Sequence, residues 1–180
     1  MERKQIDARR LGTVAHYIGV IGEYFIVILS AVWLNNVLKI RSSFSFSFRA
    51  FGFALTAFGL FLIAWCCWLQ FTMGRGTTGF SEPTKKLVTC GPYGIVRNPM
   101  MCGQFLLFAG LGFFLNLGAM FLVLPVLILA THGFTLFIEE PDLERRFGQE
   151  WVNYTERVPR WFPRLGSTQS NRKEDKECSF

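Results

Sequence analysis

The sequence lacks the cysteine patterns that mark a disulfide framework or a metal site. Its five cysteines are odd in number, and none of them forms a CxxC pair. A small-residue cleavage pattern is also absent near Asn35 and Asn36, so we interpret the first apolar run as a retained helix rather than a secretion signal. Cys178 is third from the end, whereas a prenylation box requires the fourth position, so we do not expect prenylation.

Long polar segments are also scarce. Hydrophobic residues make up 51% of the chain and charged residues 18%, a composition too apolar for an ordinary soluble domain. The apolar runs at 14–38 and 50–73 each exceed the roughly 20 residues that a helix needs to cross a bilayer. A third tract is too long for one crossing and has turn residues at 116–118. We therefore predict an all-α integral membrane protein with about four transmembrane helices, at 14–38, 50–73, 100–115 and 119–138, the last two forming a hairpin.

The net charge of +6 is distributed unevenly over this topology. The N-terminal segment, the second loop and the C-terminal segment carry four, four and eight Lys or Arg residues, against three in the first loop. The positive-inside rule places the basic face in the cytoplasm and explains the charge without a nucleic acid partner. We therefore expect both termini to be cytoplasmic, at the inner membrane of a bacterium or the endoplasmic reticulum of a eukaryote.

An acidic pair ends the fourth predicted helix. The apolar run stops at Glu139 and Glu140, followed by Pro141. Charge at the end of a membrane helix is costly and suggests a functional role. His132 precedes Glu139 by seven residues, about two helical turns, so we expect both side chains on one face. Pro141 predicts a kink that turns an amphipathic surface helix, at 142–156, over the cytosolic mouth of the bundle.

The second loop ends in another informative stretch. Residues 74–98 form the one long loop of the predicted topology, and long loops in compact proteins are often functional. Asn98 followed by Pro99 predicts a helix start, with Asn as N-cap and Pro in the first turn. Free N–H groups at such a start attract anions, and Arg97 stands beside them. The stretch suits a carboxylate or phosphate, although a capped helix with an interfacial arginine explains these residues equally well.

Patterns in the first two helices are less specific. His16 and Glu23 are seven residues apart and share a face, which fits either contact with neighbouring helices or the lining of a cavity. Gly52 and Gly59 share a face of the second helix and predict close helix packing. We expect residues 1–166 to form a single membrane domain and the polar tail at 167–180 to be disordered.

The second half of the chain carries short motifs in a defined order. They are Gly91-Pro92-Tyr93, Val96-Arg97-Asn98-Pro99-Met100, His132, Glu139-Glu140-Pro141 and the aromatic and basic stretches at 145–154 and 158–163. In order and spacing this series resembles the isoprenylcysteine carboxyl methyltransferase family and the related phospholipid methyltransferases, in a form similar to small bacterial members. The resemblance extends from Cys90 to Arg164, about half the chain.

The resemblance implies an integral membrane methyltransferase that uses S-adenosylmethionine, bound in a cytosol-facing pocket near the last two helices. Arg97 and the amides after Asn98 suit the carboxylate of this cofactor, and Glu139 or Glu140 suits its ammonium. Alignment with His132 favours Glu139 as the inward-pointing acid. The implied cofactor-binding residues are Gly91, Tyr93, Arg97, Asn98, Pro99, Met100, His132, Glu139 and Glu140.

The methyl acceptor is left open by the sequence. The first interpretation is carboxyl methylation of a lipophilic or lipid-linked acceptor, with Arg157 or Arg160 as catalytic residues that orient its anionic head. Phospholipid N-methylation and methylation of a small thiol are alternatives. A non-enzymatic membrane scaffold or carrier is an alternative of another class. It is supported by two departures from the usual family pattern, Gly94 in place of a larger residue and Met101 in place of Tyr. Membrane lipids are expected contacts, and nothing indicates the oligomeric state.

Overall fold

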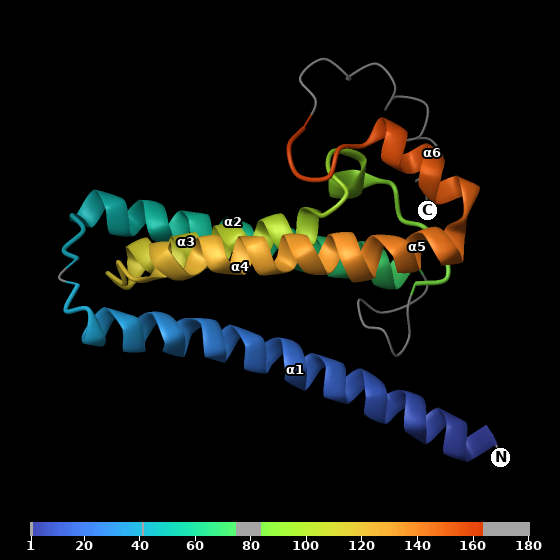
Figure 1. Cartoon of the computed structure of the whole chain (residues 1–180), viewed down its shortest axis with the longest axis horizontal. Helices are drawn as coiled ribbons and strands as arrows, with labels where there is room; N and C mark the ends of the chain where they lie inside the picture. The colour runs from blue at the N-terminus through green and yellow to red at the C-terminus, as the bar shows by residue number, and fades with distance from the viewer. Residues whose placement is uncertain (1, 41, 75–83, 164–180) are drawn as a thin grey trace.

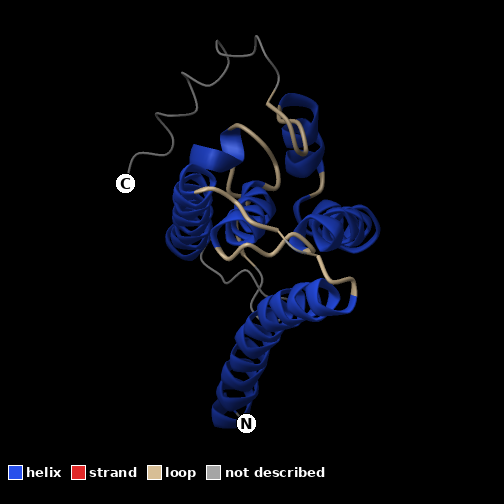
Figure 2. Cartoon of the chain, turned by 90° about the vertical axis from the view of Figure 1, so that its left-hand side faces the viewer, coloured by secondary structure: helices blue, strands red, loops and turns tan. Residues whose placement is uncertain are grey.

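The computed structural model describes residues 2–40, 42–74 and 84–163, with side chains from residue 18 onward. Within this part of the chain all regular structure is helical (Figures 1 and 2). The predicted disordered tail at 167–180 and the side chain of His16 lie outside the described residues. The elements are α1 (Glu2–Val37), α2 (Phe46–Thr72), the 3-10 turn η1 (Gly91–Gly94), α3 (Pro99–Phe114), α4 (Met120–Phe134), the π-helical turn η2 (Thr135–Glu139), α5 (Glu140–Phe147) and α6 (Gln149–Arg157).

Three described segments are long and apolar enough to cross a membrane. They are Ile18–Val37 in α1, the whole of α2, and Met120–Phe147, which runs from α4 through α5. The 16 residues of α3 are apolar too, but they span only about 24 Å at 1.5 Å per residue, less than the roughly 30 Å hydrocarbon core. These three segments agree with the predicted helical membrane protein, whereas the predicted count of about four transmembrane helices stays a prediction, because α3 is shorter than the hydrocarbon core.

Helices α2 and α3 pack with their backbones almost in contact. A Cβ atom added at Gly52 would lie 2.7 Å from the carbonyl oxygen of Gly110, and one at Gly59 would lie 2.6 Å from that of Gly103. In both helices the two glycines are seven residues apart and share one face. The predicted close packing through Gly52 and Gly59 is therefore confirmed, and it fixes the short α3 within the bundle.

Helix α1 packs less extensively on the rest of the bundle. Its Val27 and Ala31 are buried in a core with Phe108 of α3 and Met120 of α4. Toward its N-terminus α1 diverges from the other helices (Figures 1 and 2). The start of α1, the chain between α2 and α3, and α5 with α6 all lie at the same end of the bundle (Figure 1).

The segment around Pro141 differs from the prediction. The helical segment does not end at Pro141 but continues from Met120 to Phe147. The turn η2 closes with a hydrogen bond from the Glu140 N–H to the Thr135 carbonyl, one residue wider than an α-helical turn. This wider turn lets Pro141 begin α5 without breaking the helix. The chain turns instead at Gly148, with φ 53° and ψ −125°, so the predicted surface helix at 142–156 is two helices.

Candidate active site

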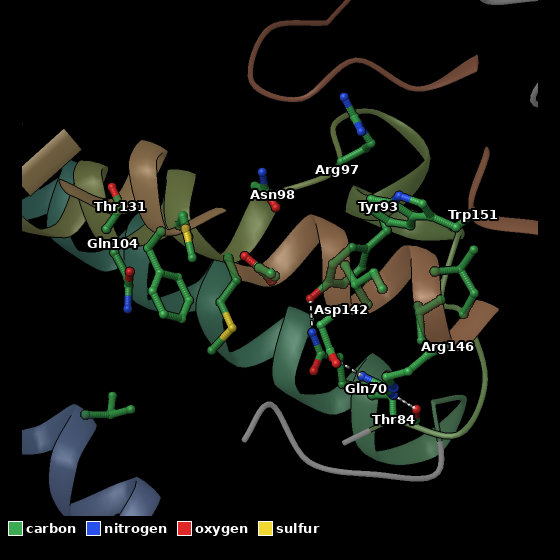
Figure 3. Close-up of a pocket in the computed structure, with 18 of the residues that line it drawn as sticks. Gln70, Thr84, Tyr93, Arg97, Asn98, Gln104, Thr131, Asp142, Arg146 and Trp151 are labelled. Atoms are coloured by element: carbon green, nitrogen blue, oxygen red, sulfur yellow. Dashed lines mark hydrogen bonds and ion pairs between the residues drawn. The ribbon is translucent and has the colours of Figure 1, made fainter. Parts of the chain in front are cut away.

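A cavity of about 570 Å³ lies at the end of the bundle that carries α5 and α6. Its volume falls in the range of small-molecule sites. Figure 3 shows Arg146 and Thr84 at one end of it and Gln104 and Thr131 at the other. We call the polar end the mouth, lined by Thr84, Arg97, Asn98, Glu139, Asp142 and Arg146, and the end among the helices the arm, lined by Val20, Glu23, Met101, Gln104, Leu127, Ala130, Thr131 and Phe134.

Two segments that are distant in the sequence form one wall of the mouth. The N–H of Arg97 donates to the carbonyl of Pro159 at 2.9 Å, and the N–H of Asn98 donates to that of Arg160 at 3.3 Å. The chain after α6 therefore returns alongside the start of α3. The aromatic residues of α6 support this return, because Trp151 and Tyr154 are buried in one apolar cluster.

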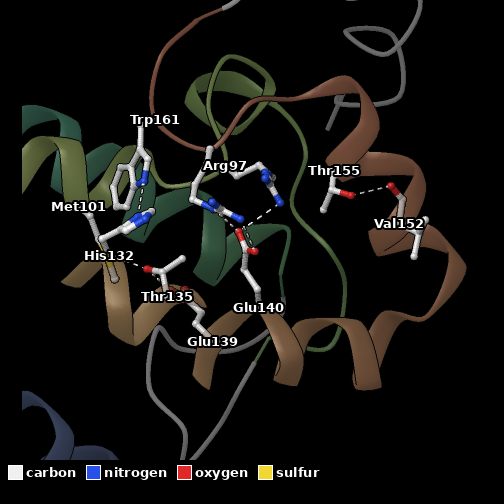
Figure 4. A network of polar contacts seen from close by, with 10 residues as sticks. Arg97, Met101, His132, Thr135, Glu139, Glu140, Val152, Thr155 and Trp161 are labelled. Atoms are coloured by element: carbon white, nitrogen blue, oxygen red, sulfur yellow. Dashed lines mark hydrogen bonds and ion pairs between the residues drawn. The ribbon is translucent and has the colours of Figure 1, made fainter. Parts of the chain in front are cut away.

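Glu140 holds these two segments together through its carboxylate (Figure 4). Arg160 donates from Nε to Oε1 at 2.7 Å and from Nη2 to Oε2 at 2.8 Å, while Nη1 of Arg97 lies 3.2 Å from Oε1. Bidentate pairs of this kind are among the strong hydrogen bonds of proteins, and this one raises the pKa of Arg160. Glu140 lines a second cavity of about 450 Å³. Its contacts are those of a clamp between two chain segments.

Glu139 faces the other way, into the mouth of the main cavity. Its Oε2 accepts a hydrogen bond from Thr135 Oγ1 at 3.3 Å. Thr135 is fully buried, and its hydroxyl also lies 3.6 Å from the sulfur of Met101. The π-helical turn η2 contains both Thr135 and Glu139, and such turns occur frequently at functional sites. The two adjacent acids therefore serve different cavities.

The structure does not bring His132 to the main cavity with Glu139. Its Nδ1 accepts a hydrogen bond from Trp161 Nε1 at 3.0 Å, and Trp161 packs on Phe105 with ring centroids 5.8 Å apart. In a continuous α-helix, seven residues make about two turns. Because η2 lies between the two residues and is wider than an α-helical turn, this spacing does not place them on one face.

The start of α3 leaves an unusual polar group in the cavity wall. The helix begins at Pro99 with Asn98 at the N-cap position, as predicted, but the Asn98 side chain makes no capping hydrogen bond. Its Nδ2 is buried and has no hydrogen-bond partner in the described part of the chain. An unsatisfied buried donor costs roughly 1–3 kcal/mol. Asn98 and Met100 both line the main cavity, so a bound ligand can supply the missing acceptor.

Tyr93 and Gly91 support the mouth from η1. Gly91 adopts φ +60°, a conformation that glycine accepts readily, and lies outside the lining of the main cavity. Tyr93 lines the cavity and accepts a hydrogen bond from Gln70 Nε2 at 2.5 Å. Its carbonyl accepts from the Tyr154 hydroxyl at 2.7 Å. Burial raises the pKa of Tyr93 well above its usual value, so it remains a neutral hydroxyl.

The two arginines predicted as catalytic lie outside the main cavity. Arg157 is exposed on α6 and donates from Nε to the carbonyl of Asn153 at 3.2 Å. Arg160 lines the second cavity and is paired with Glu140. Contact of either arginine with an acceptor remains a prediction.

Sequence reasoning missed other side chains in the mouth. Arg146 pairs with Asp142 at 3.2 Å and donates to the carbonyl of Thr84, and all three residues line the cavity. The spacing of four between Asp142 and Arg146 was visible in the sequence as an expected helical ion pair. Trp151 also lines the cavity, with the Arg97 guanidinium 5.7 Å from its ring centroid. Its place in the mouth depends on the turn at Gly148, which the sequence argument did not include.

The described chain is a helical bundle with three segments long and apolar enough to cross a membrane and a cavity at one end. A family model described as phospholipid methyltransferase matches residues 48–150, more than half of the chain. The chain belongs to the phospholipid methyltransferase family, a family of membrane methyltransferases. No curated protein and no solved structure matches the chain. The match extends from α2 into α6 and therefore covers all six residues named as the mouth, whereas α1 lies outside it.

Proposed function

We propose that this protein transfers a methyl group from S-adenosylmethionine to a lipophilic acceptor at the cytosolic face of the membrane. The observation that carries the proposal is the main cavity, which joins a polar mouth to an arm among apolar helices. A water-soluble donor and an acceptor carried in the bilayer can meet in a site of this form. The excess of Lys and Arg in the segments at this end supports a cytosolic orientation.

The residues of the mouth fit the donor. Glu139 offers a carboxylate to the ammonium group of S-adenosylmethionine. The unsatisfied amide N–H of Asn98 can donate a hydrogen bond to the carboxylate or the ribose of S-adenosylmethionine. The start of α3 adds the backbone N–H groups of its first turn. When bound, S-adenosylmethionine supplies an electrophilic methyl group. The task left to the protein is to align the acceptor with that group in a dry site.

The arm supports an amine acceptor better than an anionic one. The described side chains that line it include one carboxylate, Glu23, and the neutral groups of Gln104 and Thr131, but no cation. We therefore propose N-methylation of an amine-bearing lipid. Carboxyl methylation of a prenylated cysteine is a second candidate, favoured by Arg97 and Arg146 in the mouth. The alternative of a non-enzymatic scaffold or carrier predicts ligand binding without a methylated product.

Donor binding tests the assignment of the mouth. We expect titration calorimetry in detergent to show S-adenosylmethionine binding that Glu139→Gln weakens by more than about tenfold, or 1.4 kcal/mol. The matched control is Glu150→Gln, which removes an exposed acid of α6 outside the main cavity and should leave the affinity unchanged. Unaltered affinity of Glu139→Gln would refute the donor site. Absence of binding by the unmodified protein would refute the function.

A further inference from the structure

We propose that α1 completes the acceptor site and that Glu23 positions the acceptor. In this proposal its carboxylate holds the ammonium head of a lipid amine in the arm and takes up the proton that the head loses on methylation. The inference rests on the proposed function and assigns a role to a helix outside the residues that the family model matches.

The first support is the position of Glu23 in the membrane. It is the one charged residue between Ile18 and Val37, in a segment long and apolar enough to cross the bilayer. An ionisable residue within such a segment by default marks a functional group; at the centre of the bilayer its charge costs roughly 2.5–3.5 kcal/mol, and Glu23, the sixth residue of the segment, lies nearer to its end. Its side chain lines the arm of the main cavity. A cationic ligand in the arm would offset this cost.

The second support is the contact that fixes α1 beside Glu23. The adjacent Tyr24 accepts a hydrogen bond from Gln104 Nε2 at 3.0 Å, and its ring meets Phe108 edge to face at 5.4 Å between centroids. Val27, one turn further along α1, is buried in the core with α3 and α4. These contacts fix the rotation of α1. They place Glu23, which is an exposed residue, at the lining of the arm, where Gln104 also lines the cavity.

The third support is the distribution of charge along the cavity. In the mouth Arg146 pairs with Asp142, and Arg97 pairs with Glu140. Glu23 has no ion pair within the part of the chain that the structure describes. Glu139 in the mouth accepts from Thr135 and suits the ammonium of the donor. Glu23 is therefore the acid best placed to receive a second cation, one that arrives within the bilayer.

The flanks of the arm fit arrival from the lipid. Ile18 and Ile21 of α1 and Val126 and Leu129 of α4 are all exposed, by 56% to 71%. The helices α1 and α4 diverge toward the end that holds the cavity (Figure 1). Apolar surface on both helices allows acyl chains to remain in the bilayer while the head group reaches Glu23.

The chemistry gives the carboxylate a defined task. An alkyl ammonium has a pKa of about 10.4, as in lysine, so at pH 7 it has no lone pair to attack a methyl group. In water the transfer of this proton to a carboxylate is uphill by roughly six pKa units, so in this proposal Glu23 takes the proton only as the nitrogen attacks the methyl group. The nitrogen lone pair forms the N–C bond while the S–C bond of the donor breaks, and the electron pair of that bond remains on sulfur as a thioether. General base catalysis of this kind contributes about 10²- to 10⁴-fold.

Two measurements on Glu23→Gln, Glu23→Asp and the control Glu150→Gln test the proposal. The first is the binding affinity for dodecylamine and for dodecanol, a measurement that does not depend on methyl transfer. We expect Glu23→Gln to weaken dodecylamine binding by about tenfold or more, with dodecanol and S-adenosylmethionine binding unchanged. The second is the pH profile of lipid amine methylation. We expect the methylation rate of Glu23→Gln to be about 100-fold lower than that of the unmodified protein at pH 7 and to recover as the pH rises, because solvent must then remove the proton from the ammonium. Glu23→Asp should retain part of both properties.

The outcomes separate the two proposals. Unchanged dodecylamine binding in Glu23→Gln would overturn the role of Glu23. Equal loss of dodecylamine, dodecanol and S-adenosylmethionine binding would overturn it too, because it would show a purely structural effect. Methylation of a lipid amine with an unaltered pH profile in Glu23→Gln would overturn it as well. Selective loss of dodecylamine binding without methylation of any lipid would support the amine site and refute the proposed function.

Discussion

Replacing Glu140 with Gln removes the carboxylate that Arg97 and Arg160 share. The substitution keeps the shape of the side chain but removes its charge and one of its two acceptor oxygens. Arg97 and Arg160, at side-chain exposures of 11% and 27%, would then both lose the carboxylate that they share. We expect the chain after α6 to loosen from the start of α3.

The magnitude follows from the contacts that are lost. Glu140 receives two hydrogen bonds of 2.7 and 2.8 Å and one ion pair of 3.2 Å, and its side chain is 16% exposed. Breaking a buried ion pair from one side costs about 3–5 kcal/mol. Because water can partly reach Arg160, we expect the lower end, about 3 kcal/mol. At about 2–4 °C per kcal/mol for a chain of this size, the thermal midpoint should fall by about 6–12 °C.

Thermal unfolding in detergent, followed by tryptophan fluorescence, measures this shift, because Trp151 and Trp161 lie beside the network. Glu150→Gln is the control for loss of an exposed acid and should change the midpoint by no more than about 2 °C. A double-mutant cycle with Arg160→Gln should give a coupling energy above about 1 kcal/mol. A Glu140→Gln midpoint equal to that of the control would show that the network does not hold the two segments together.

Three other substitutions test the packing and the cavity. Gly59→Val places side-chain atoms against the Gly103 carbonyl and should lower the free energy of unfolding by about 1–3 kcal/mol or more. The control Gly19→Val, with nothing within 4 Å of the added Cβ, should be nearly neutral. Equal thermal midpoints of the two variants would contradict the α2–α3 contact. Gly148→Ala should cost about 1–3 kcal/mol in the same assay because of its positive φ, and an unchanged midpoint would contradict that turn. Asn98→Ala should raise the midpoint of the ligand-free protein, since it removes an unsatisfied donor, and should weaken donor binding; a lower midpoint without weaker binding would contradict its role.

Local signals predicted much of the helical arrangement. The hydrophobic tract at 100–138 divides at a turn in which Asn116 adopts a positive φ, as its residue type permits. Helix α3 begins at Pro99, where the Asn-Pro pair predicted a helix start. These features depend on residues close together in the sequence. Their backbone preferences and hydropathy are sufficient to indicate them.

The π-helical turn was beyond this kind of reasoning. Residues 135–139 have no composition that distinguishes a π turn from an α-helical one, and the extra residue in the turn changes which face each later side chain occupies. For this reason the structure separates Glu139 from His132, which does not line the cavity that Glu139 lines. Glu139 was predicted to point inward because of an alignment with His132 that the structure does not have.

Long-range partners were the other missing element. Arg97, Glu140 and Arg160 were each identified as candidate site residues, but their mutual pairing depends on where the chain after α6 returns. Backbone hydrogen bonds from the N–H groups of Arg97 and Asn98 to the carbonyls of the returning chain fix that return, and no local pattern encodes them. Glu23 was noted only as one residue of an intramembrane pair. Its place in the arm depends on how α1 packs against α3 and α4.

The most direct test of the proposed methyl transfer is the fate of a labelled methyl group. Purified protein is incubated with methyl-labelled S-adenosylmethionine and membrane lipids, and the labelled product is separated into the organic phase and identified. We expect an N-methylated lipid with the unmodified protein and with Glu150→Gln. At a limiting concentration of S-adenosylmethionine, Glu139→Gln should form at least about tenfold less of this product. A protein that binds the donor but labels no lipid above the protein-free background would contradict the proposed methyl transfer.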